Sequence, residues 1–537
     1  MSERGSGFQL NRKQKEGLLY LLLFLLSVIL LWFPGRADCY LIDDSYTYME
    51  ITSRMEGVMP VYPFFLYGNR LLFGEDCYLR AVVLEQTVFA AFCVLLFIRM
   101  LRKRFQLNVW ETGVCLLLAL LPFTADMPET MVNREILTEG IAYAAYYLFA
   151  AAFLQTVWRK SVKWYGILWA VTLMISAIRS QLQILFIACG AACIYVAVLR
   201  KGNGNRRKIP LRLLIGLAGC LLTVPAGVFM TSRISILHNS VAEKMSLYRD
   251  AEAESAVDAA KQEVLEEAET DVAEEPVTQE AENEPPQAVP EPKTSQYVTL
   301  IFNKGIYEAD YEDYRLFEDE KLQNLFLRIY ESIDREQCRY AYARSGLWMW
   351  KDLVKSAAAG VACIDAQAAF YAEECPEVYQ SGSYSDIRSR NQIVIGLTLI
   401  KAHFGRFLYH TLMLLPQAFV STVFFQIERF YLLCHLITLF LYLSAIVLTV
   451  WAYRDRKAER ACGEFMCSVL GINLVLVIVI SVVFFGQKRY LFYNFGLFYI
   501  AYFLLLLQAW KQYGKAFFLA KMRGKANRED RKGDGSV

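Results

Sequence analysis

The sequence predicts an all-α fold: a polytopic transmembrane helix bundle of about ten spans, with an external, partly disordered helical insertion. Three observations predict it. Hydrophobic residues make up 55% of the 537 residues, a share typical of membrane proteins. Apolar runs of helix length recur in both halves of the chain, with short basic segments between them. A long acidic stretch without such runs separates the two groups, and we expect it to lie outside the membrane.

The N-terminal membrane domain, residues 1–230, contains seven of the predicted spans. A bilayer core about 30 Å thick needs roughly 20 apolar residues per helix. The first run has a basic flank but no small residues at the spacing of a signal-peptidase site, so we expect an uncleaved span. The seven runs lie near residues 17–34, 81–98, 109–124, 136–157, 164–179, 182–199 and 210–230.

The basic clusters predict the orientation of the spans. They precede the first run and then follow every second run, at residues 99–104, 159–163 and 200–208. Because cytoplasmic loops carry an excess of Lys and Arg, these clusters should face the cytoplasm. We therefore expect a multi-pass plasma membrane protein with both termini in the cytoplasm and the loop at residues 35–80 outside.

The middle of the chain predicts an external region in two parts. Residues 231–295 form an acidic insertion, and its segment 250–293 is rich in Glu, Ala and Pro and nearly free of aromatic residues. Such a composition cannot bury enough apolar surface to fold, so we expect disorder there. Residues 296–404 regain apolar residues at helical spacing, which predicts an external helical subdomain. Leu322, Leu325, Phe326, Ile329 and Tyr330 show this spacing.

The C-terminal spans are expected within residues 405–510, followed by a basic cytoplasmic tail at 511–537. If all four apolar runs of this part crossed the membrane, the tail would lie outside, against the positive-inside rule. Residues 405–426 contain Arg406, His410 and Pro416. We therefore expect this segment to be an interfacial or re-entrant helix.

Several classes of site and partner are disfavoured. The thirteen cysteines form no CxxC pair and do not group with the four histidines, which argues against zinc or iron–sulfur sites. Cys39 and Cys77 lie in one predicted loop, where a disulfide between them stays open. The basic residues follow membrane topology, so no nucleic-acid partner is expected.

The first outer loop carries the candidate catalytic residues, Asp43 and Asp44. They stand just beyond a membrane boundary, where a carboxylate avoids the cost of the hydrocarbon yet can meet a substrate anchored in it. The alternative is that Asp44 or Ser45 merely caps a solvated helix.

Other conspicuous polar residues belong to the same predicted side. Glu135 and Glu139 are four residues apart and would share one helix face at the mouth of the fourth span. If the site is functional, the cations hold a lipid-linked phosphate and a carboxylate transfers a proton. Otherwise the cations reach to lipid headgroups and Glu139 pairs with Arg134. The set comprises Arg134, Glu135, Glu139, Arg179, Gln181, Lys488, Arg489 and Tyr490.

The order of these motifs is a recognisable pattern. It runs Asp43-Asp44-x-x-x-Tyr48, Gly57, Pro60-Val-Tyr-Pro63, Leu72-Phe-Gly74, Leu137-Thr-Glu139, Ile178-Arg179 and Arg489-Tyr490. The chain thus resembles the GT-C superfamily of polytopic glycosyltransferases, which includes protein O-mannosyltransferases and the aminoarabinose transferases of lipid A. The resemblance covers roughly residues 17–230 and 400–510, and not the acidic insertion.

The resemblance implies roles for individual residues. An acidic residue of the first outer loop is the proposed base in that superfamily, which maps onto Asp43 or Asp44. The D-x-x-x-Y spacing to Tyr48 favours Asp44, although many relatives have Asp-Glu there. The late Arg-Tyr element lies near the lipid phosphate, which maps onto Arg489 and Tyr490.

We therefore expect an inverting transfer of a sugar from a polyprenyl phosphate donor to a lipid, glycan or protein acceptor at the outer face of the membrane. Asp43 or Asp44 would act as base, and Glu139, Arg179, Lys488, Arg489 and Tyr490 would bind substrate. No cofactor is required, although a divalent metal could bind Asp43, Asp44 and Glu139. The alternative is a transporter or flippase of a lipid-linked glycan, with charges expected near the bilayer midplane. The same cations would then bind the phosphate during passage.

Overall fold

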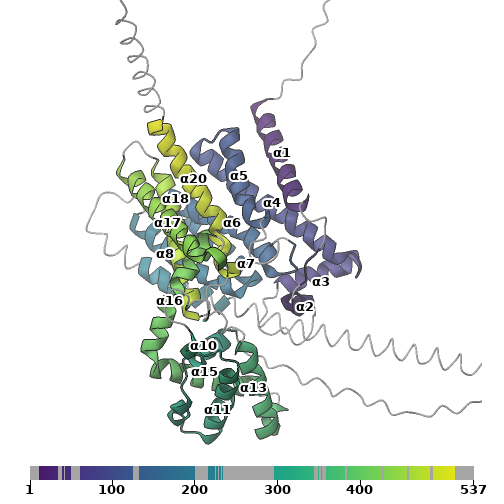
Figure 1. The fold of residues 1–537 in the computed structure, drawn as a ribbon. Helices are drawn as coiled ribbons and strands as arrows, with labels where there is room; N and C mark the ends of the chain where they lie inside the picture. The colour runs from purple at the N-terminus through teal and green to yellow at the C-terminus, as the bar shows by residue number, and fades with distance from the viewer. Residues whose placement is uncertain are drawn as a thin grey trace, which may run out of the picture. The chain divides into compact units, whose positions relative to one another are not determined.

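The computed structural model is α-helical (Figure 1), and within the part of the chain that it describes there is no strand, only one isolated β-bridge. The structure describes residues 11–33, 39–41, 43–49, 61–124, 132, 134–199, 216–223, 225–227, 229–230, 233, 296–343, 349, 352, 359–380, 384–424, 428–455, 459–483 and 488–514. The predicted acidic segment 250–293 lies outside these residues.

Seven helical stretches among the described residues are long and apolar enough to cross a membrane, which supports a polytopic membrane protein. Three shorter apolar helices accompany them: α5 (Val109–Thr124), α7 (Val162–Ile178) and Gly216–Gly227. The seven stretches correspond to α1 (Arg12–Trp32), α4 (Tyr78–Phe105), α6 (Thr138–Arg159), η3 with α8 (Ser180–Ile184, Leu185–Leu199), α17 (Tyr431–Arg454), α18 (Arg460–Val483), and η10 with α20 (Phe492–Asn494, Phe495–Ala509).

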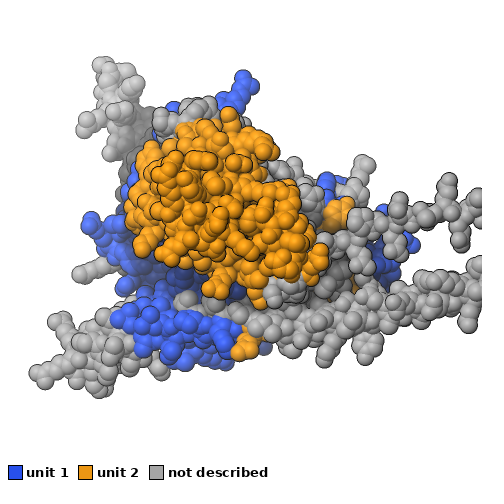
Figure 2. Space-filling view, turned by 90° about the horizontal axis from the view of Figure 1, so that it is seen from below, with its two compact units in different colours: residues 1–45, 69–231, 411–537 blue, residues 46–68, 232–410 orange. Residues whose placement is uncertain are grey.

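The chain divides into two compact units, which have different colours in Figure 2. Unit 1 comprises residues 1–45, 69–231 and 411–537 and includes the apolar helices. Unit 2 comprises residues 46–68 and 232–410. The division cuts α2 (Asp43–Met49), α3 (Val61–Phe73) and α16 (Phe404–Val423). The helix α16 contains Pro416 and is not one of the seven candidate spans.

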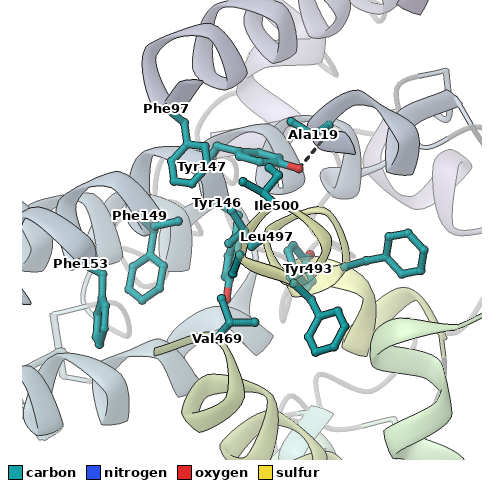
Figure 3. Packing of buried hydrophobic residues seen from close by; sticks show 14 of the residues in the cluster. Phe97, Ala119, Tyr146, Tyr147, Phe149, Phe153, Val469, Tyr493, Leu497 and Ile500 are labelled. Carbon is teal, nitrogen blue, oxygen red and sulfur yellow. Dashed lines mark hydrogen bonds between the residues drawn. The ribbon is translucent and has the colours of Figure 1, made fainter. Parts of the chain in front are cut away.

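Aromatic side chains fill the core of unit 1 where α4, α5, α6 and α20 meet (Figure 3). Tyr146, Tyr147 and Phe149 of α6 are fully buried among them. The Tyr147 hydroxyl donates to the Ala119 carbonyl at 2.8 Å, close to Pro122, which interrupts the hydrogen-bond ladder of α5. A Cβ atom on Gly496 would lie 3.1 Å from the Leu118 carbonyl oxygen and even nearer the Tyr147 hydroxyl. Glycine at 496 therefore lets α20 approach α5 closely.

The basic ends of the unit 1 helices are joined by ion pairs and ring contacts. Lys511, just after α20, reaches Glu111 at the start of α5 at 2.6 Å. Arg104, in the last turn of α4, pairs with Glu459 ahead of α18. Arg99 lies 5.4 Å from the Tyr20 ring centroid of α1. Basic residues of the clusters that the structure describes, Arg99, Arg104 and Lys511, thus contact other helices or their ends. This agrees with the common side that their alternation in the sequence predicts.

Unit 2 is built from short helices around a small core. They are α10 (Gln296–Ile306), α11 (Glu320–Arg335), α13 (Ala359–Glu374), α14 (Pro376–Tyr379) and α15 (Tyr384–Ala402). Asp319 caps α11 through a hydrogen bond from the Lys321 backbone. The predicted apolar face of α11 is confirmed, because Leu325, Phe326 and Ile329 are buried and Leu322 is half-buried.

Candidate functional site

The first and second predicted outer loops meet through their backbones. The Tyr40 amide donates to the Arg134 carbonyl at 3.1 Å, and the Ile136 amide donates to the Tyr40 carbonyl at 3.2 Å. This forms an isolated parallel bridge between Tyr40 and Glu135. The loops are therefore fixed side by side three residues before Asp43.

The backbones of Asp43 and Asp44 begin α2. Their side chains lie outside the described structure, so the carboxylates keep their sequence-based assignment. No disulfide joins Cys39 and Cys77, because both are free thiols.

The segment before α6 corrects one expectation. Glu135 does not share a helix face with Glu139, because α6 begins at Thr138 and its N-cap Leu137 is extended. The backbone around Glu135 bonds to Tyr40 instead of entering the helix. Both carboxyl side chains are nevertheless buried.

Two buried side chains hold this segment in place. Arg134 is 2% exposed, and its Nη2 donates to the Trp32 carbonyl at the end of α1 at 2.9 Å. Gln86 of α4 donates from Nε2 to the Glu135 carbonyl at 3.2 Å. A Cβ atom on Gly140 would lie 2.5 Å from the Gln86 Oε1 atom, so the glycine makes room for the Gln86 amide.

Glu139 and Arg179 form a buried ion pair between the start of α6 and the end of α7. Their side chains are 8% and 7% exposed, and the contact joins Glu139 Oε2 to Arg179 Nη1. The Thr138 hydroxyl bridges the two charges: it accepts from Arg179 Nη1 and donates to Glu139 Oε2, each at 3.0 Å. Arg179 Nε also donates to Gln181 Oε1 at 2.6 Å. Removing one partner would leave a buried charge uncompensated.

Tyr490 adds an aromatic face to the pair. The Arg179 Cζ atom lies 5.3 Å from the Tyr490 ring centroid, within range of a cation–π interaction. Tyr490 belongs to α19 (Lys488–Leu491), immediately before η10 and α20. Lys488 and Arg489 share this short helix by backbone, while their side chains lie outside the described structure. The structure thus brings Glu139, Arg179 and Tyr490 together from three distant parts of the sequence.

A neutral polar chain crosses the core of unit 1. The Tyr146 hydroxyl donates to Asn494 Oδ1 at 2.7 Å, and Asn494 Nδ2 donates to Asn473 Oδ1 at 2.8 Å. Asn473 Nδ2 then donates to the Tyr442 hydroxyl at 3.0 Å, and that hydroxyl lies 2.7 Å from Thr422 Oγ1. These hydrogen bonds link α6, η10, α18, α17 and α16 and satisfy groups that would otherwise be costly in an apolar bundle.

Among the described residues, one group of side chains has the spacing of a metal site. Asp310, Asp313 and His403 of unit 2 place their ligand atoms within 4.8 Å of one another. However, the Arg406 guanidinium donates to both Asp310 oxygens, at 3.2 and 2.7 Å. This contact lowers the pKa of Asp310 chiefly through the hydrogen bond. With the Arg406 cation fixed on Asp310 and with the His403 ring hydrogen-bonded to Asp313 at 2.6 Å, the candidate ligand atoms already have partners and the group fits a metal poorly.

Two contributors to the site were missed in the sequence, Tyr40 and Gln86. Both act through backbone groups of the Glu135 segment, and neither residue type marks such a role.

The environment of Arg179 can hold an anion beside an aromatic face, close to loops that carry acidic residues. No family model matches the chain, and no curated protein matches it well enough to be a relative.

Proposed function

We propose that the protein transfers a sugar from a polyprenyl phosphate donor to a hydroxyl acceptor at the end of the bundle that carries Glu139 and Arg179. One observation carries the proposal: a buried Arg179–Glu139 pair faces Tyr490. The first loop is fixed nearby, because the Tyr40–Glu135 bridge binds it to the segment that leads into α6. A cation at a membrane boundary, next to an acidic loop, suits a substrate with a phosphate head and an apolar tail.

The reaction would be a single displacement. The acceptor oxygen attacks the anomeric carbon, the bond from that carbon to the phosphate oxygen breaks, and the configuration inverts. Asp43 or Asp44 takes the acceptor proton and later releases it to water. The departing lipid phosphate keeps the electron pair and gains negative charge, which Arg179, Lys488 and Arg489 would stabilise.

Glu139 would act by positioning Arg179. In the absence of donor, the carboxylate and the Thr138 hydroxyl hold the guanidinium in place. An arriving phosphate can exchange with the carboxylate as partner, because guanidinium groups bind both anions in the same planar geometry. The acceptor, whether lipid, glycan or protein, would approach from the aqueous side of the first loop.

A flippase for a lipid-linked glycan is the alternative. A carrier of a charged headgroup would favour cations near the middle of its helices. In α4 and α6 no charged residue occurs between residues 86 and 98 or between 140 and 158. The polar chain through Asn473 and Asn494 is neutral and internally hydrogen-bonded. These features favour chemistry at the helix ends over passage through the bundle.

The test is release of polyprenyl phosphate. Purified full-length protein is incubated with a panel of polyprenyl phosphate sugars and candidate acceptors, and the freed lipid phosphate is quantified by mass spectrometry. We expect time-dependent release with at least one sugar. Movement of intact donor between leaflets of proteoliposomes, without release, would instead support the flippase.

Arg179→Lys connects any such activity to this site. Lysine keeps the charge but cannot bond Glu139, Thr138 and Gln181 together, so we expect release to fall at least about tenfold. Arg80→Lys, at an exposed position of α4, is the matched control and should behave like the wild type. Equal activity in the two variants would remove Arg179 from the mechanism.

A further inference from the structure

A cavity of ≈ 640 Å³ lies at the basic end of unit 1. Residues from α4, α6, α7 and α18 line it. The α6 lining residue nearest to Glu139 is Ala151, twelve residues later, so about 18 Å of helix separates this cavity from the candidate active site. It is therefore a second and independent feature of the bundle.

The charges at the cavity are mainly positive. Arg99, Lys103, Arg104 and Arg159 line it, with Glu464 as the single carboxylate among the lining residues. Glu464 already accepts a hydrogen bond from Tyr195 at 3.3 Å. The Lys103 ammonium has no ion-pair or hydrogen-bond partner among the described residues. An anion would compensate this excess of positive charge.

Apart from Gln155, which accepts a hydrogen bond from Arg159 at 2.6 Å, the remaining walls are apolar or aromatic. Leu96 of α4 lies about one turn before Arg99, and Ala151 of α6 lies about two turns before Arg159. Met100 of α4 adds an apolar side chain next to Arg99. Trp158 and Trp164 complete the wall, and Arg104 and Arg159 lie 5.6 and 5.4 Å from their ring centroids. Indole rings beside arginines and next to aliphatic walls are typical of the membrane interface.

We propose that this cavity binds an anionic phospholipid of the leaflet at the basic end of the bundle, which the positive-inside rule makes the cytoplasmic leaflet. The phosphate and its glycerol group would lie among Arg99, Lys103 and Arg159, and the first part of an acyl chain along Leu96, Met100 and Ala151. Free phosphate would use the cations alone and leave the apolar wall uncovered. The observations therefore favour a lipid.

The test measures lipid preference at the protein surface. Full-length protein is reconstituted in phosphatidylcholine bilayers containing spin-labelled phosphatidylglycerol or spin-labelled phosphatidylcholine, and the relative association constants are compared. We expect selective association of phosphatidylglycerol with the wild type. The combined variant Arg99→Gln, Lys103→Gln, Arg159→Gln should lose that selectivity by about tenfold or more, because each cation near an anionic surface contributes roughly a factor of five.

The matched control removes three other basic-end charges, with Lys160→Gln, Lys163→Gln and Arg454→Gln, none of which lines the cavity. It should keep most of the selectivity. Ala151→Trp fills the apolar wall without altering charge and should also reduce association, with unchanged helix content by circular dichroism as the folding check. Equal losses in the control and cavity triple variants would overturn the proposal in favour of diffuse attraction. Displacement of the lipid by inorganic phosphate at millimolar concentration would overturn it in favour of a free-anion site.

Discussion

The Arg179 guanidinium is shared between the Glu139 carboxylate and the face of the Tyr490 ring. Through these contacts the start of α6, the end of α7 and the segment before α20 are joined at one end of the bundle. Each helix end carries polar groups that an apolar environment would penalise, and here they satisfy one another. Because of these shared contacts, a substitution of Arg179 tests both the stability of this end of the bundle and the proposed function.

The first prediction concerns the stability of this pair. Arg179→Ala should destabilise unit 1 by about 3–5 kcal/mol, because it leaves the Glu139 carboxylate buried without its cation. Adding Glu139→Gln should recover part of the loss, since the amide removes that charge. Denaturant titration of the two single variants and the double variant measures the coupling free energy. Additive losses would show that the two residues are energetically independent.

The second prediction concerns the packing of unit 2. The helices α10 and α15 approach so closely that a Cβ atom on Gly396 would lie 2.8 Å from the Phe302 Cα atom, a backbone contact that cannot rotate away. Gly396→Ala should therefore destabilise unit 2 by roughly 1–3 kcal/mol. Gly405→Ala is the control, because no atom lies within 4 Å of its added Cβ. Protection of the α10 amides from hydrogen exchange should fall in the first variant and not in the second.

The third prediction is a pH dependence caused by Lys304 in α10. Burial lowers the pKa of Lys304 to about 7, with Glu308 opposing the shift. The unfolded lysine has an ordinary pKa near 10.5, so the unfolded state binds more protons between these values. The unfolding free energy of unit 2 should therefore rise with pH from about 7 to 10, by at most about 1.4 kcal/mol per pH unit.

Lys304→Met should remove this rise and stabilise unit 2 at pH 7. The control is Lys401→Met, at an exposed position of α15, which should keep the wild-type pH dependence. The measurement is the unfolding midpoint at several values between pH 7 and 9.5. A Lys304→Met profile parallel to that of the wild type would assign the pH dependence to other groups.

The fourth prediction concerns orientation. Asp76 and Lys163 are both exposed. If the basic clusters face the cytoplasm, a cysteine introduced at Asp76 lies outside the cell and one introduced at Lys163 lies inside. In a background with Cys77→Ser and Cys467→Ser, which removes the exposed native thiols, a membrane-impermeant maleimide added to intact cells should label Asp76→Cys only. Labelling of Lys163→Cys from outside would reverse the orientation and place the candidate site in the cytoplasm.

Much of the architecture follows from the sequence because the membrane imposes a simple length rule. Apolar runs predicted helices α4, α6 and α17. The alternation of basic clusters predicted a common side for them, and the ion pairs of Arg104 with Glu459 and of Lys511 with Glu111 agree with that prediction. Apolar spacing likewise predicted α11. Where composition and the spacing of apolar residues decide the structure, the sequence alone is sufficient to predict it.

The details of the candidate site depend on contacts between distant segments. The i,i+4 spacing of Glu135 and Glu139 suggested one helix, yet the backbone bridge to Tyr40 competes with the helix and delays its start to Thr138. The sequence pointed to Glu139, Arg179 and Tyr490 as one set. That Glu139 pairs with Arg179, and that Thr138 lies between them, depends on how α6 and α7 pack, which no local pattern encodes.

The most direct test of the central claim is the single-turnover release of polyprenyl phosphate by Asp43→Asn and Asp44→Asn, using a donor that the wild type accepts. Asparagine keeps the size of the side chain and removes proton acceptance. The variant at the base should therefore lose about 10²–10⁴-fold in rate while donor affinity is largely kept. Asp76→Asn, at an exposed aspartate of the same predicted outer loop, should retain the wild-type rate. Wild-type rates in both Asp43→Asn and Asp44→Asn would contradict the proposed catalytic role of the first loop.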